Sequence, residues 1–315
     1  MKKPLVILTG PTAVGKTELS ITLAKKINGE IISADSMQVY RNMDIGTAKI
    51  TLQEMEGVPH HLIDCLDFTE DFNVYTFKKL ALSAMEEIYS KGRIPIITGG
   101  TGFYIGALLY DTDLSESTVE TDYRLELENY ARENGNHALF EMLREVDPKS
   151  CETIHENNVK RVIRALEFYK QNGTPISAHN DKERAKLSPY NNAYFVLTDD
   201  RELLYERINR RVDIMLEKGL LEEVRSLREK GLKRGMTAAE AIGYKQLFDY
   251  VDGLSDLDSA VEKIKMDSRR YAKRQLTWFR REKDPIWLDR SLLKSNDEIM
   301  TRILEILKER GIYNG

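Results

Sequence analysis

The segment "GPTAVGKT" at residues 10–17 constrains the fold more than any other part of this 315-residue chain. It fits the pattern G-x-x-x-x-G-K-[ST], in which backbone N–H groups surround phosphate oxygens, the lysine neutralises them and the last hydroxyl binds Mg²⁺. The apolar run "PLVILT" precedes it and apolar residues at helical spacing follow it. The sequence therefore predicts a phosphate-binding loop between a strand and a helix, with Mg²⁺ on Thr17 and phosphate contacts from Gly10, Pro11, Thr12, Ala13, Val14, Gly15, Lys16 and Thr17.

Three further apolar runs have the character of buried strands: "GEIISADS", "RIPIITGG" and "AYFVLTDD". Continuous apolar strands that alternate with helices are typical of a parallel sheet covered on both faces. We therefore expect an α/β fold, a P-loop NTPase-like parallel sheet flanked by helices. Ligands in such sheets bind beyond the carboxyl ends of the strands, so Asp35 and Thr101 should face the same crevice as Lys16.

The middle of the chain has a different pattern. Residues 115–186 have helical periodicity with polar loops and no convincing strand, and residues 115–157 carry a net charge of −7. This predicts an all-helical domain at 115–186, inserted into a core made of residues 1–114 and 187–315, the latter with the C-terminal helices. Within the insertion, "VKRVIRALEFY" brings Lys160, Arg161 and Arg164 within one helical turn, with apolar residues on the other side.

Composition excludes several classes of protein. The net charge of −4 means that any nucleic-acid surface must be local. Two cysteines are too few for a disulfide framework or a Cys-based zinc site. No run of about 18 apolar residues predicts a membrane span, and the N-terminal segment lacks the pattern of a signal peptide. We expect a cytoplasmic protein without a membrane partner.

Three features have both a structural and a chemical interpretation. Asp35, at the end of a strand, is either a turn former or a reactive carboxylate opposite the phosphate loop. Arg207 and Arg211 are four residues apart on one helix, so they either clamp phosphate oxygens or belong to a solvated face. The pair His60–His61 has no partner at metal-ligand spacing, and we interpret it as structural.

A late basic segment has a similar ambiguity. Residues 260–283 carry a net charge of +6 and include "RRYAKRQLTWFRR". Its aromatic residues Tyr271, Trp278 and Phe279 belong either to the core or to a surface that combines base stacking with phosphate contacts. The sequence pattern alone does not choose between these two interpretations.

Taken together, these motifs resemble one family. The segments that carry the resemblance occur in the same order in bacterial tRNA dimethylallyltransferases: "GPTAVGKT", "SADSMQVYRNMDIGTAK", "PHHLID", "GGTGFYIGALL", "VKRVIRALE", "LYERINRRVDIML", "AIGYKQ" and "AKRQLTWFRR". The resemblance extends from about Pro4 to Leu288. It implies transfer of a dimethylallyl group from dimethylallyl diphosphate to N6 of the adenosine 3′ of the anticodon. The loop would then hold the allylic diphosphate with Mg²⁺, and ATP would not be consumed.

The resemblance also implies roles for individual residues. The general base corresponds to Asp35, the adenosine contact to Thr101, and the arginine near the diphosphate to Arg211, with Arg207 a second candidate. The helical insertion would clasp the tRNA anticodon stem–loop, and we expect a monomer. Residues that match RNA-contacting segments are Asp35, Ser36, Met37, Gln38, Thr101, Arg124, Lys160, Arg161, Val162, Ile163, Arg164, Gly243, Tyr244, Lys245, Lys273, Arg274, Gln275 and Thr277.

Three alternatives share the phosphate loop. A small-molecule kinase would consume ATP and would not need the basic segment at 260–283. A non-catalytic, ATP-switched RNA-binding module would not depend on the Asp35 carboxylate. An adenylate isopentenyltransferase would use a free nucleotide as acceptor, and the segments around Arg161 and Arg274 argue against it.

Overall fold

The computed structural model describes residues 2–114, 122–293 and 295–315. The chain divides into two compact units. The core unit comprises Met1–Asp111 and Ser188–Gly315, and the helical unit comprises Thr112–Leu187. The predicted insertion starts at Ser115, and residues 115–121 lie outside the described residues.

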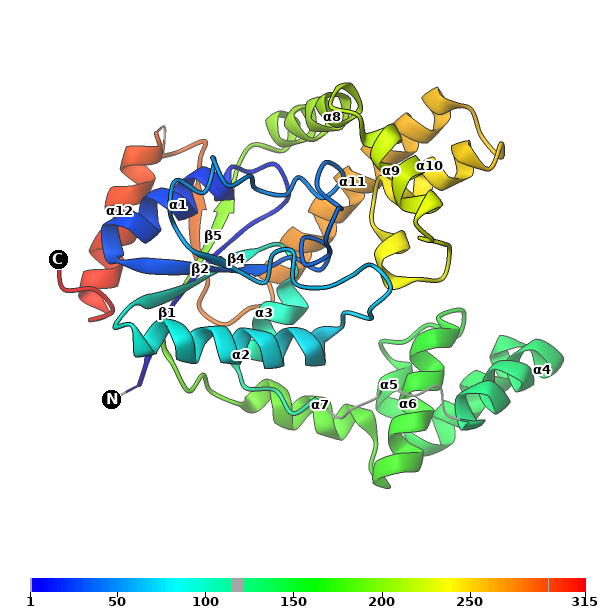
Figure 1. Ribbon diagram of the computed structural model, residues 1–315. Helices are drawn as coiled ribbons and strands as arrows, with labels where there is room; N and C mark the ends of the chain where they lie inside the picture. The colour runs from blue at the N-terminus through cyan, green and yellow to red at the C-terminus, as the bar shows by residue number, and fades with distance from the viewer. Residues whose placement is uncertain (1, 115–121, 294) are drawn as a thin grey trace. The chain divides into compact units, whose positions relative to one another are not determined.

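The core unit is built on a parallel sheet (Figure 1). Its six strands among the described residues have the order β3-β2-β4-β1-β5-β6, and every neighbouring pair is parallel. The strands are β1 (Pro4–Thr9), β2 (Gly29–Ala34), β3 (His60–His61), β4 (Ile94–Gly99), β5 (Asn191–Thr198) and β6 (Ile286–Asp289). The expected α/β fold with a flanked parallel sheet is confirmed. Sequence periodicity missed β3 and β6, because strands of two and four residues are too short to produce a pattern.

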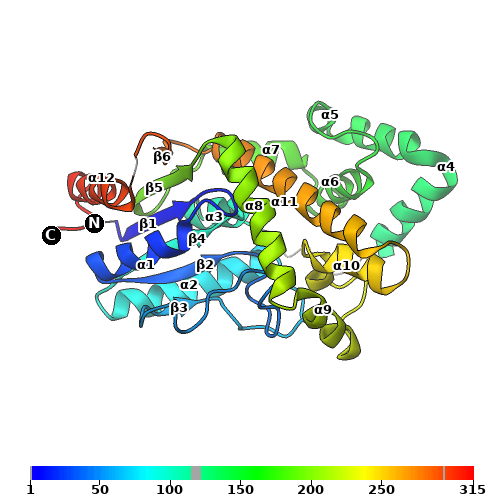
Figure 2. The same cartoon turned by 90° about the horizontal axis from the view of Figure 1, so that it is seen from above.

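Two long helices of the core unit run side by side (Figure 2). α8 (Arg201–Glu217) follows β5 directly, and α11 (Leu257–Phe279) comes before β6. Arg269 of α11 donates a hydrogen bond to Asn209 of α8 at 2.5 Å, and Lys265 pairs with Asp213 at 2.8 Å. The chain between these helices forms α9 (Leu220–Glu229), the 3₁₀ helix η1 (Thr237–Glu240) and α10 (Tyr244–Val251).

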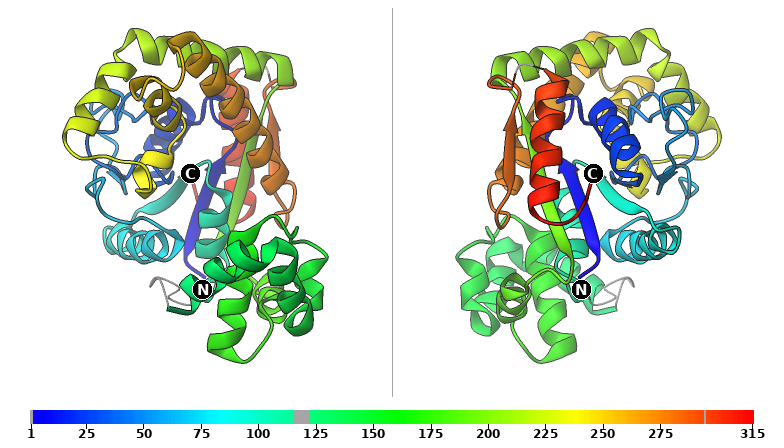
Figure 3. Two further views of the ribbon diagram at one scale, coloured as in Figure 1. Left: turned by 90° about the vertical axis from the view of Figure 1, so that its right-hand side faces the viewer. Right: turned by 90° about the vertical axis from the view of Figure 1, so that its left-hand side faces the viewer.

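Helices cover both faces of the sheet. Along β1, Leu5 and Ile7 are buried on one face, while Val6 and Leu8 are buried on the other, as strand alternation requires. The first face packs against α2 (Val74–Ser90) and α3 (Gly102–Leu109). The second packs against α1 (Lys16–Ile27) and α12 (Asn296–Glu309) (Figure 3). The carboxyl ends of the strands, where the phosphate loop lies, are left for a site.

The helical unit has its own apolar core. Its elements are α4 (Asp122–Val146), α5 (Pro148–Cys151), α6 (Val159–Asn172) and α7 (Ile176–Ala185). α4 is kinked at Gly135, whose φ and ψ are 86° and 161°. Asp147 is buried and accepts hydrogen bonds from Ser150 and Ser177, which ties the start of α5 to α7. None of the helices in the described residues is long and apolar enough to span a membrane.

Candidate active site

The phosphate loop has the backbone that its sequence predicts. Ala13 and Gly15 have positive φ values of 64° and 92°. Left-handed residues in such a loop turn successive N–H groups toward one concavity. Gly10 admits no side chain, because a Cβ there would lie 2.5 Å from the carbonyl oxygen of Leu197. Gln275 braces the loop: its Oε1 accepts from the Thr12 N–H at 2.9 Å. These contacts hold an anion-binding concavity at the start of α1.

Lys16 extends its ammonium group over this loop. Nζ donates to the carbonyl oxygens of Gly10 at 3.0 Å and Pro11 at 2.8 Å. Burial, and then the charge of Arg211, lowers the pKa of Lys16 to about 7, while Asp35 acts in the opposite direction. An anion bound in the loop would raise this pKa again, since it favours the ammonium form. Binding of a phosphate compound is therefore coupled to proton uptake by Lys16 near neutral pH.

The two arginines of α8 have different surroundings. Arg211 is partly buried, its Nη1 lies 3.4 Å from the Thr12 hydroxyl, and burial lowers its pKa. Arg207 instead pairs with Asp199 at 2.6 Å and is about half exposed. Of the two interpretations of this arginine pair, neither holds for both residues in this conformation, because Arg207 is paired with Asp199 at the end of β5 and Arg211 is at the loop. Arg211 lies beside the loop, as does the guanidinium group of Arg290, which a Cβ on Gly15 would meet at 3.3 Å.

Asp35 lies just beyond the end of β2. Its Oδ1 accepts hydrogen bonds from the N–H groups of Met37 at 2.8 Å and Gln38 at 3.3 Å. Both bonds go to Oδ1, so among the described residues Oδ2 is left for a substrate proton. Burial raises the pKa of Asp35, and the two backbone bonds and the charge of Lys16 oppose that shift. Asp35 is thus both a turn former and a carboxylate with raised basicity, which combines the two interpretations of the sequence.

Three of the residues described above, Thr12, Asp35 and Arg211, line a cavity of about 300 Å³. Its polar lining includes Thr12, Asp35, Arg211, Tyr271 and Arg274. Its apolar lining comes mainly from α8, α11 and the segment before α10, and includes Ile208, Val212, Met215, Ile242 and Ile264. A cavity with a cationic end, a carboxylate and an apolar wall suits a ligand that combines an anionic group with a short hydrocarbon.

Comparisons with known proteins agree with this chemistry. Residues 38–282 match the family model described as IPP transferase, and residues 3–70 match the one described as isopentenyl transferase. A protein of Lachnoclostridium phytofermentans named tRNA dimethylallyltransferase is 55% identical over 310 residues, which cover 98% of this chain and 99% of that protein. This chain belongs to the IPP transferase family. The resemblance inferred from the sequence motifs is confirmed.

Solved structures of the family have the same fold. The full-length tRNA isopentenylpyrophosphate transferase of Bacillus halodurans has a TM-score of 0.74 at 47% identity, with 99% of this chain and 98% of that chain covered. A eukaryotic dimethylallyltransferase, described as acting on tRNA, has a TM-score of 0.79 at 30% identity, with coverage of 98% and 85%. The fold of this chain is therefore shared with these two solved structures.

Thr101, the family's adenosine contact by resemblance, begins α3. Its hydroxyl oxygen is buried and makes no hydrogen bond of ordinary geometry within the described residues. Burial and then the charge of Asp35 raise the pKa of the nearby Tyr271 hydroxyl to about 12. The Thr101 hydroxyl is close enough to oppose that rise. A buried hydroxyl with unused capacity is what a polar substrate would satisfy.

The residues that match RNA-contacting segments divide by exposure. Lys160, Arg161, Lys273, Arg274 and Thr277 are exposed. Arg124 pairs with Glu167 at 2.6 Å, and Lys245 pairs with Glu240 at 2.6 Å. Four others have buried side chains that cannot contact RNA in this conformation, since they pack in the cores or brace loops: Val162, Ile163, Tyr244 and Gln275. Any influence of these four on RNA would act through the neighbours that they position.

Glu223 of α9 is a positioning residue that the sequence did not reveal. Its carboxylate accepts from the N–H groups of Asp44, Ile45 and Gly46 at 2.8–3.0 Å, and from the Tyr244 hydroxyl at 2.5 Å. Gly46 lines the cavity. One carboxylate therefore fixes the backbone of a cavity-lining loop from 177 residues away.

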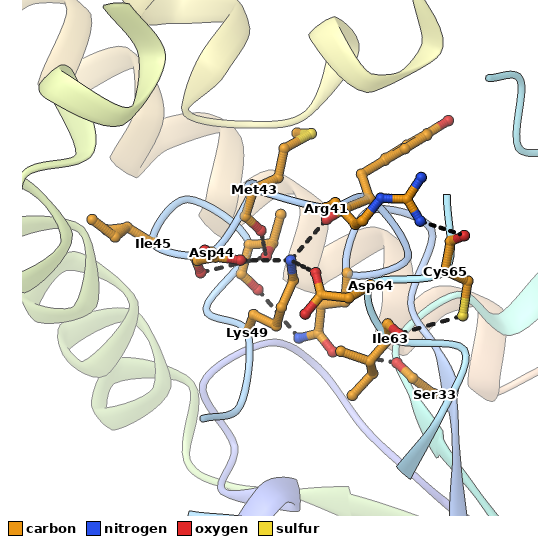
Figure 4. Close-up of polar contacts among 12 residues, drawn as sticks. Ser33, Arg41, Met43, Asp44, Ile45, Lys49, Ile63, Asp64 and Cys65 are labelled. Carbon is orange, nitrogen blue, oxygen red and sulfur yellow. Dashed lines mark hydrogen bonds and ion pairs between the residues drawn. The ribbon is translucent and has the colours of Figure 1, made fainter. Parts of the chain in front are cut away.

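Lys49 holds the other end of this loop (Figure 4). Its side chain is 4% exposed, and Nζ donates to the Tyr40 carbonyl oxygen at 2.7 Å and to the carboxylates of Asp44 and Asp64 at 2.6 and 2.5 Å. Gln38 completes the frame, since its Nε2 donates to the Thr47 carbonyl oxygen at 3.2 Å. The segment that follows Asp35 is thus cross-linked to itself by Lys49 and Gln38 and to α9 by Glu223.

Two groups have oxygen or nitrogen ligands for a cation. Thr17, in the first turn of α1, is exposed, and a hydroxyl beside a diphosphate is the kind of site that Mg²⁺ uses. Glu30, His61 and Glu87 also lie within ligand distance of one another. However, Glu30 already pairs with Arg93 at 2.6 Å and Lys91 at 3.3 Å, and it lies at the start of β2, away from Asp35. This cluster is an ion-pair network around the one buried carboxylate, Glu30, which agrees with the structural interpretation of His61.

Proposed function

We propose that this chain transfers a dimethylallyl group from dimethylallyl diphosphate to N6 of the adenosine 3′ of the anticodon, in tRNAs that read codons beginning with U. Diphosphate is released and ATP is not consumed. The observation that carries the proposal is one cavity lined by Asp35, Arg211 and an apolar wall, beside the phosphate loop. Each of these three features serves a different part of the reaction.

The cationic end of the cavity assists departure of diphosphate. The allylic carbon–oxygen bond breaks, and the leaving oxygen gains negative charge. Lys16, Arg211 and the loop N–H groups stabilise that charge more strongly as it grows, because they are already oriented and poorly hydrated. Thr17 would hold Mg²⁺, which when bound neutralises further charge on the diphosphate.

Asp35 handles the proton of the nucleophile. The exocyclic amine of adenine is a weak nucleophile whose N–H becomes acidic as the new carbon–nitrogen bond forms. The Asp35 carboxylate accepts that proton, and its raised pKa makes it a stronger base than an ordinary carboxylate. The Thr101 hydroxyl would bind the adenine, since it has unused hydrogen-bonding capacity.

The apolar wall binds the five-carbon group and excludes water from the allylic carbon. Ile208, Val212 and Ile264 offer branched aliphatic surface of the appropriate size. Exclusion of water matters because hydrolysis would compete with attack by the amine. This aliphatic surface therefore suits the hydrocarbon of a prenyl donor.

The RNA lies outside the cavity and presents one flipped base to it. Exposed cations on α11 and on α6 of the helical unit would contact the phosphates of the anticodon arm: Lys160, Arg161, Lys273 and Arg274.

A label-transfer assay tests the proposal. Purified protein is incubated with Mg²⁺, radiolabelled dimethylallyl diphosphate and unmodified tRNA, with AMP or ATP as acceptor in parallel tubes. We expect label in tRNA only, and its loss with Asp35→Ala. Label in free nucleotide alone would indicate an adenylate isopentenyltransferase, and ATP turnover without transfer would indicate a kinase.

A further inference from the structure

The cavity-lining face of α11 continues beyond the cavity to an exposed tryptophan. Ile264, Ser268, Tyr271 and Arg274 line the cavity at helical spacing. The next residue on this stripe is Trp278, one turn after Arg274. One helical turn advances about 5.4 Å, so the indole lies at the rim of the cavity rather than on a remote surface.

Trp278 is joined at this rim by a second exposed aromatic residue. Phe103 of α3 contacts it with ring centroids 5.9 Å apart and ring planes at 71°. Trp278 is 37% exposed and Phe103 is 46% exposed. Large aromatic side chains are costly to leave in water, and a contiguous exposed pair beside a site indicates a binding surface.

The pair is directly connected to the adenosine-binding end of the site. Trp278 packs on Gly102, where a Cβ would lie 2.1 Å from the indole ring, so glycine is needed for this approach. Gly102 follows Thr101, whose buried hydroxyl we assigned to the adenine. The indole therefore lies one residue away from the contact to the target base.

The indole is held in place and has apolar surface to offer. Its Nε1–H donates to the Glu282 carboxylate at 3.0 Å, and the Tyr110 hydroxyl donates to the same side chain at 3.3 Å. The polar edge of the ring is thus satisfied within the protein. The part that remains exposed is apolar, which selects a planar apolar partner rather than a hydrogen-bonding one.

Charge around the pair selects a polyanion. Lys273, Arg274 and Arg281 precede and follow Trp278 on the chain and are exposed. Within the part of the chain that the structure describes, no carboxylate pairs with any of the three at salt-bridge distance. Aromatic rings combined with unpaired cations are the features that bind unstacked nucleotides.

We propose that Trp278 and Phe103 form a stacking platform for the unpaired base next to the target adenosine. This inference rests on the proposed function, because it assumes that the target base is flipped into the cavity. Flipping removes the stacking partner of the neighbouring base. The platform replaces that partner, and so it stabilises the flipped RNA without reading a hydrogen-bond pattern.

The chain allows a direct spectroscopic test, since Trp278 and Trp287 are its only tryptophans. Trp287→Phe leaves Trp278 as the sole indole, and its fluorescence is followed during titration with an anticodon stem–loop RNA. We expect quenching that saturates together with RNA binding measured by anisotropy. The same RNA with 2-aminopurine beside the target adenosine should lose fluorescence when it binds wild-type protein, and lose less when it binds Trp278→Leu.

Kinetics supply the second measurement. Trp278→Ala should raise the KM for RNA by roughly 5- to 150-fold, while the KM for dimethylallyl diphosphate stays within about twofold. Trp278→Phe should recover most of the loss, because it keeps an aromatic face. Trp287→Ala is the matched control: Trp287 is 39% exposed on β6, and its removal should leave both constants unchanged.

The outcomes separate this inference from the proposed function. RNA that binds and is alkylated normally, with unchanged Trp278 fluorescence and an unaffected Trp278→Ala variant, would overturn the platform and leave the function intact. RNA that neither binds nor is alkylated would overturn the proposed function. Trp278 fluorescence that changes with protein concentration alone would assign the pair to contacts between copies of the chain, and the platform would be wrong.

Discussion

The cations at the phosphate loop and the exposed cations of α6 and α11 differ in what surrounds them. Lys16 and Arg211 are partly buried, contact the phosphate loop and have lowered pKa values because of burial. Lys273 and Arg161 are exposed, and the described residues offer neither of them an ion-pair partner. Both groups are positively charged, but only the first has lost most of its water.

This difference determines what each group can do. A poorly hydrated, oriented charge interacts strongly with charge that forms beside it, so it acts on the rate of bond breaking. A hydrated surface charge attracts a polyanion at long range and is screened by salt, so it acts on affinity. Variants of the two groups should therefore differ in kind as well as in size.

Removal of the Asp35 carboxylate should have the largest effect. Asp35→Asn keeps the shape but cannot accept a proton, so kcat should fall by about 10²- to 10⁴-fold while tRNA affinity stays near wild type. Steady-state label transfer and filter binding measure the two. Asp258→Asn, which changes an exposed carboxylate at the start of α11, is the control and should leave kcat unchanged. Turnover near wild type in Asp35→Asn would remove Asp35 as the base.

The same variant carries a stability prediction. Burial raises the pKa of Asp35, so the folded state binds this proton more tightly than the unfolded state does. The wild-type protein therefore loses stability as pH rises through the folded-state pKa, and Asp35→Asn does not. At pH 8 the Tm of Asp35→Asn should equal or exceed that of wild type. A lower Tm would mean that the Asp35 turn contributes more than the burial of its charge costs.

The two arginines of α8 should separate next. Arg211→Ala removes a cation beside the loop, and kcat should fall by about 10²-fold with a raised KM for dimethylallyl diphosphate. Arg207→Ala, one turn away and paired with Asp199, should change either constant by less than about threefold. Equal losses in the two variants would restore the clamp that the sequence suggested, formed only when substrate is bound.

Titration of Lys16 gives a pH-dependent prediction. Its pKa is about 7 in the free protein, so above that pH the bound diphosphate must recruit a proton to the amine. The KM for dimethylallyl diphosphate should then rise by up to about tenfold per pH unit between pH 7 and 9. Lys16→Arg cannot titrate in this range and should lose that part of the slope. The ligand's own titration is common to both proteins and cancels. Identical slopes would place the titrating group elsewhere.

The sequence predicts what is local in this site and misses what is distant. The phosphate loop and Asp35 follow the ends of apolar strands, and parallel topology alone brings those ends to one edge. The braces of the site are long-range contacts: Gln275 to Thr12 is separated by 263 residues, and Glu223 to Gly46 by 177. The periodicity of a sequence does not predict such long-range contacts, because these contacts depend on how α9 and α11 pack.

The late basic helix shows the same limit on a smaller scale. Tyr271 and Trp278 are seven residues apart and lie on the same face of α11 as the cavity-lining residues. Phe279, the next residue along the helix, lies on another face and is fully buried in the core. Helical spacing predicts that 271 and 278 share a face and that 279 does not. It does not predict which face meets the sheet, and so the sequence alone does not choose between the core and surface interpretations.

The exposed cations should give the smallest effects, and these should have a distinct signature. Lys273→Ala and Arg161→Ala each remove about one phosphate contact, so tRNA affinity should fall severalfold and the slope of log affinity against log salt should flatten by about one. kcat at saturating tRNA should not change, since neither residue lines the cavity.

Lys79→Ala, at an exposed lysine of α2 outside the RNA-matching segments, is the control and should leave the slope unchanged. If Lys273→Ala keeps the wild-type slope of log affinity against log salt, α11 is not part of the RNA surface. If the same variant has a reduced kcat, surface charge also acts on the transition state, and the distinction between buried and exposed cations fails.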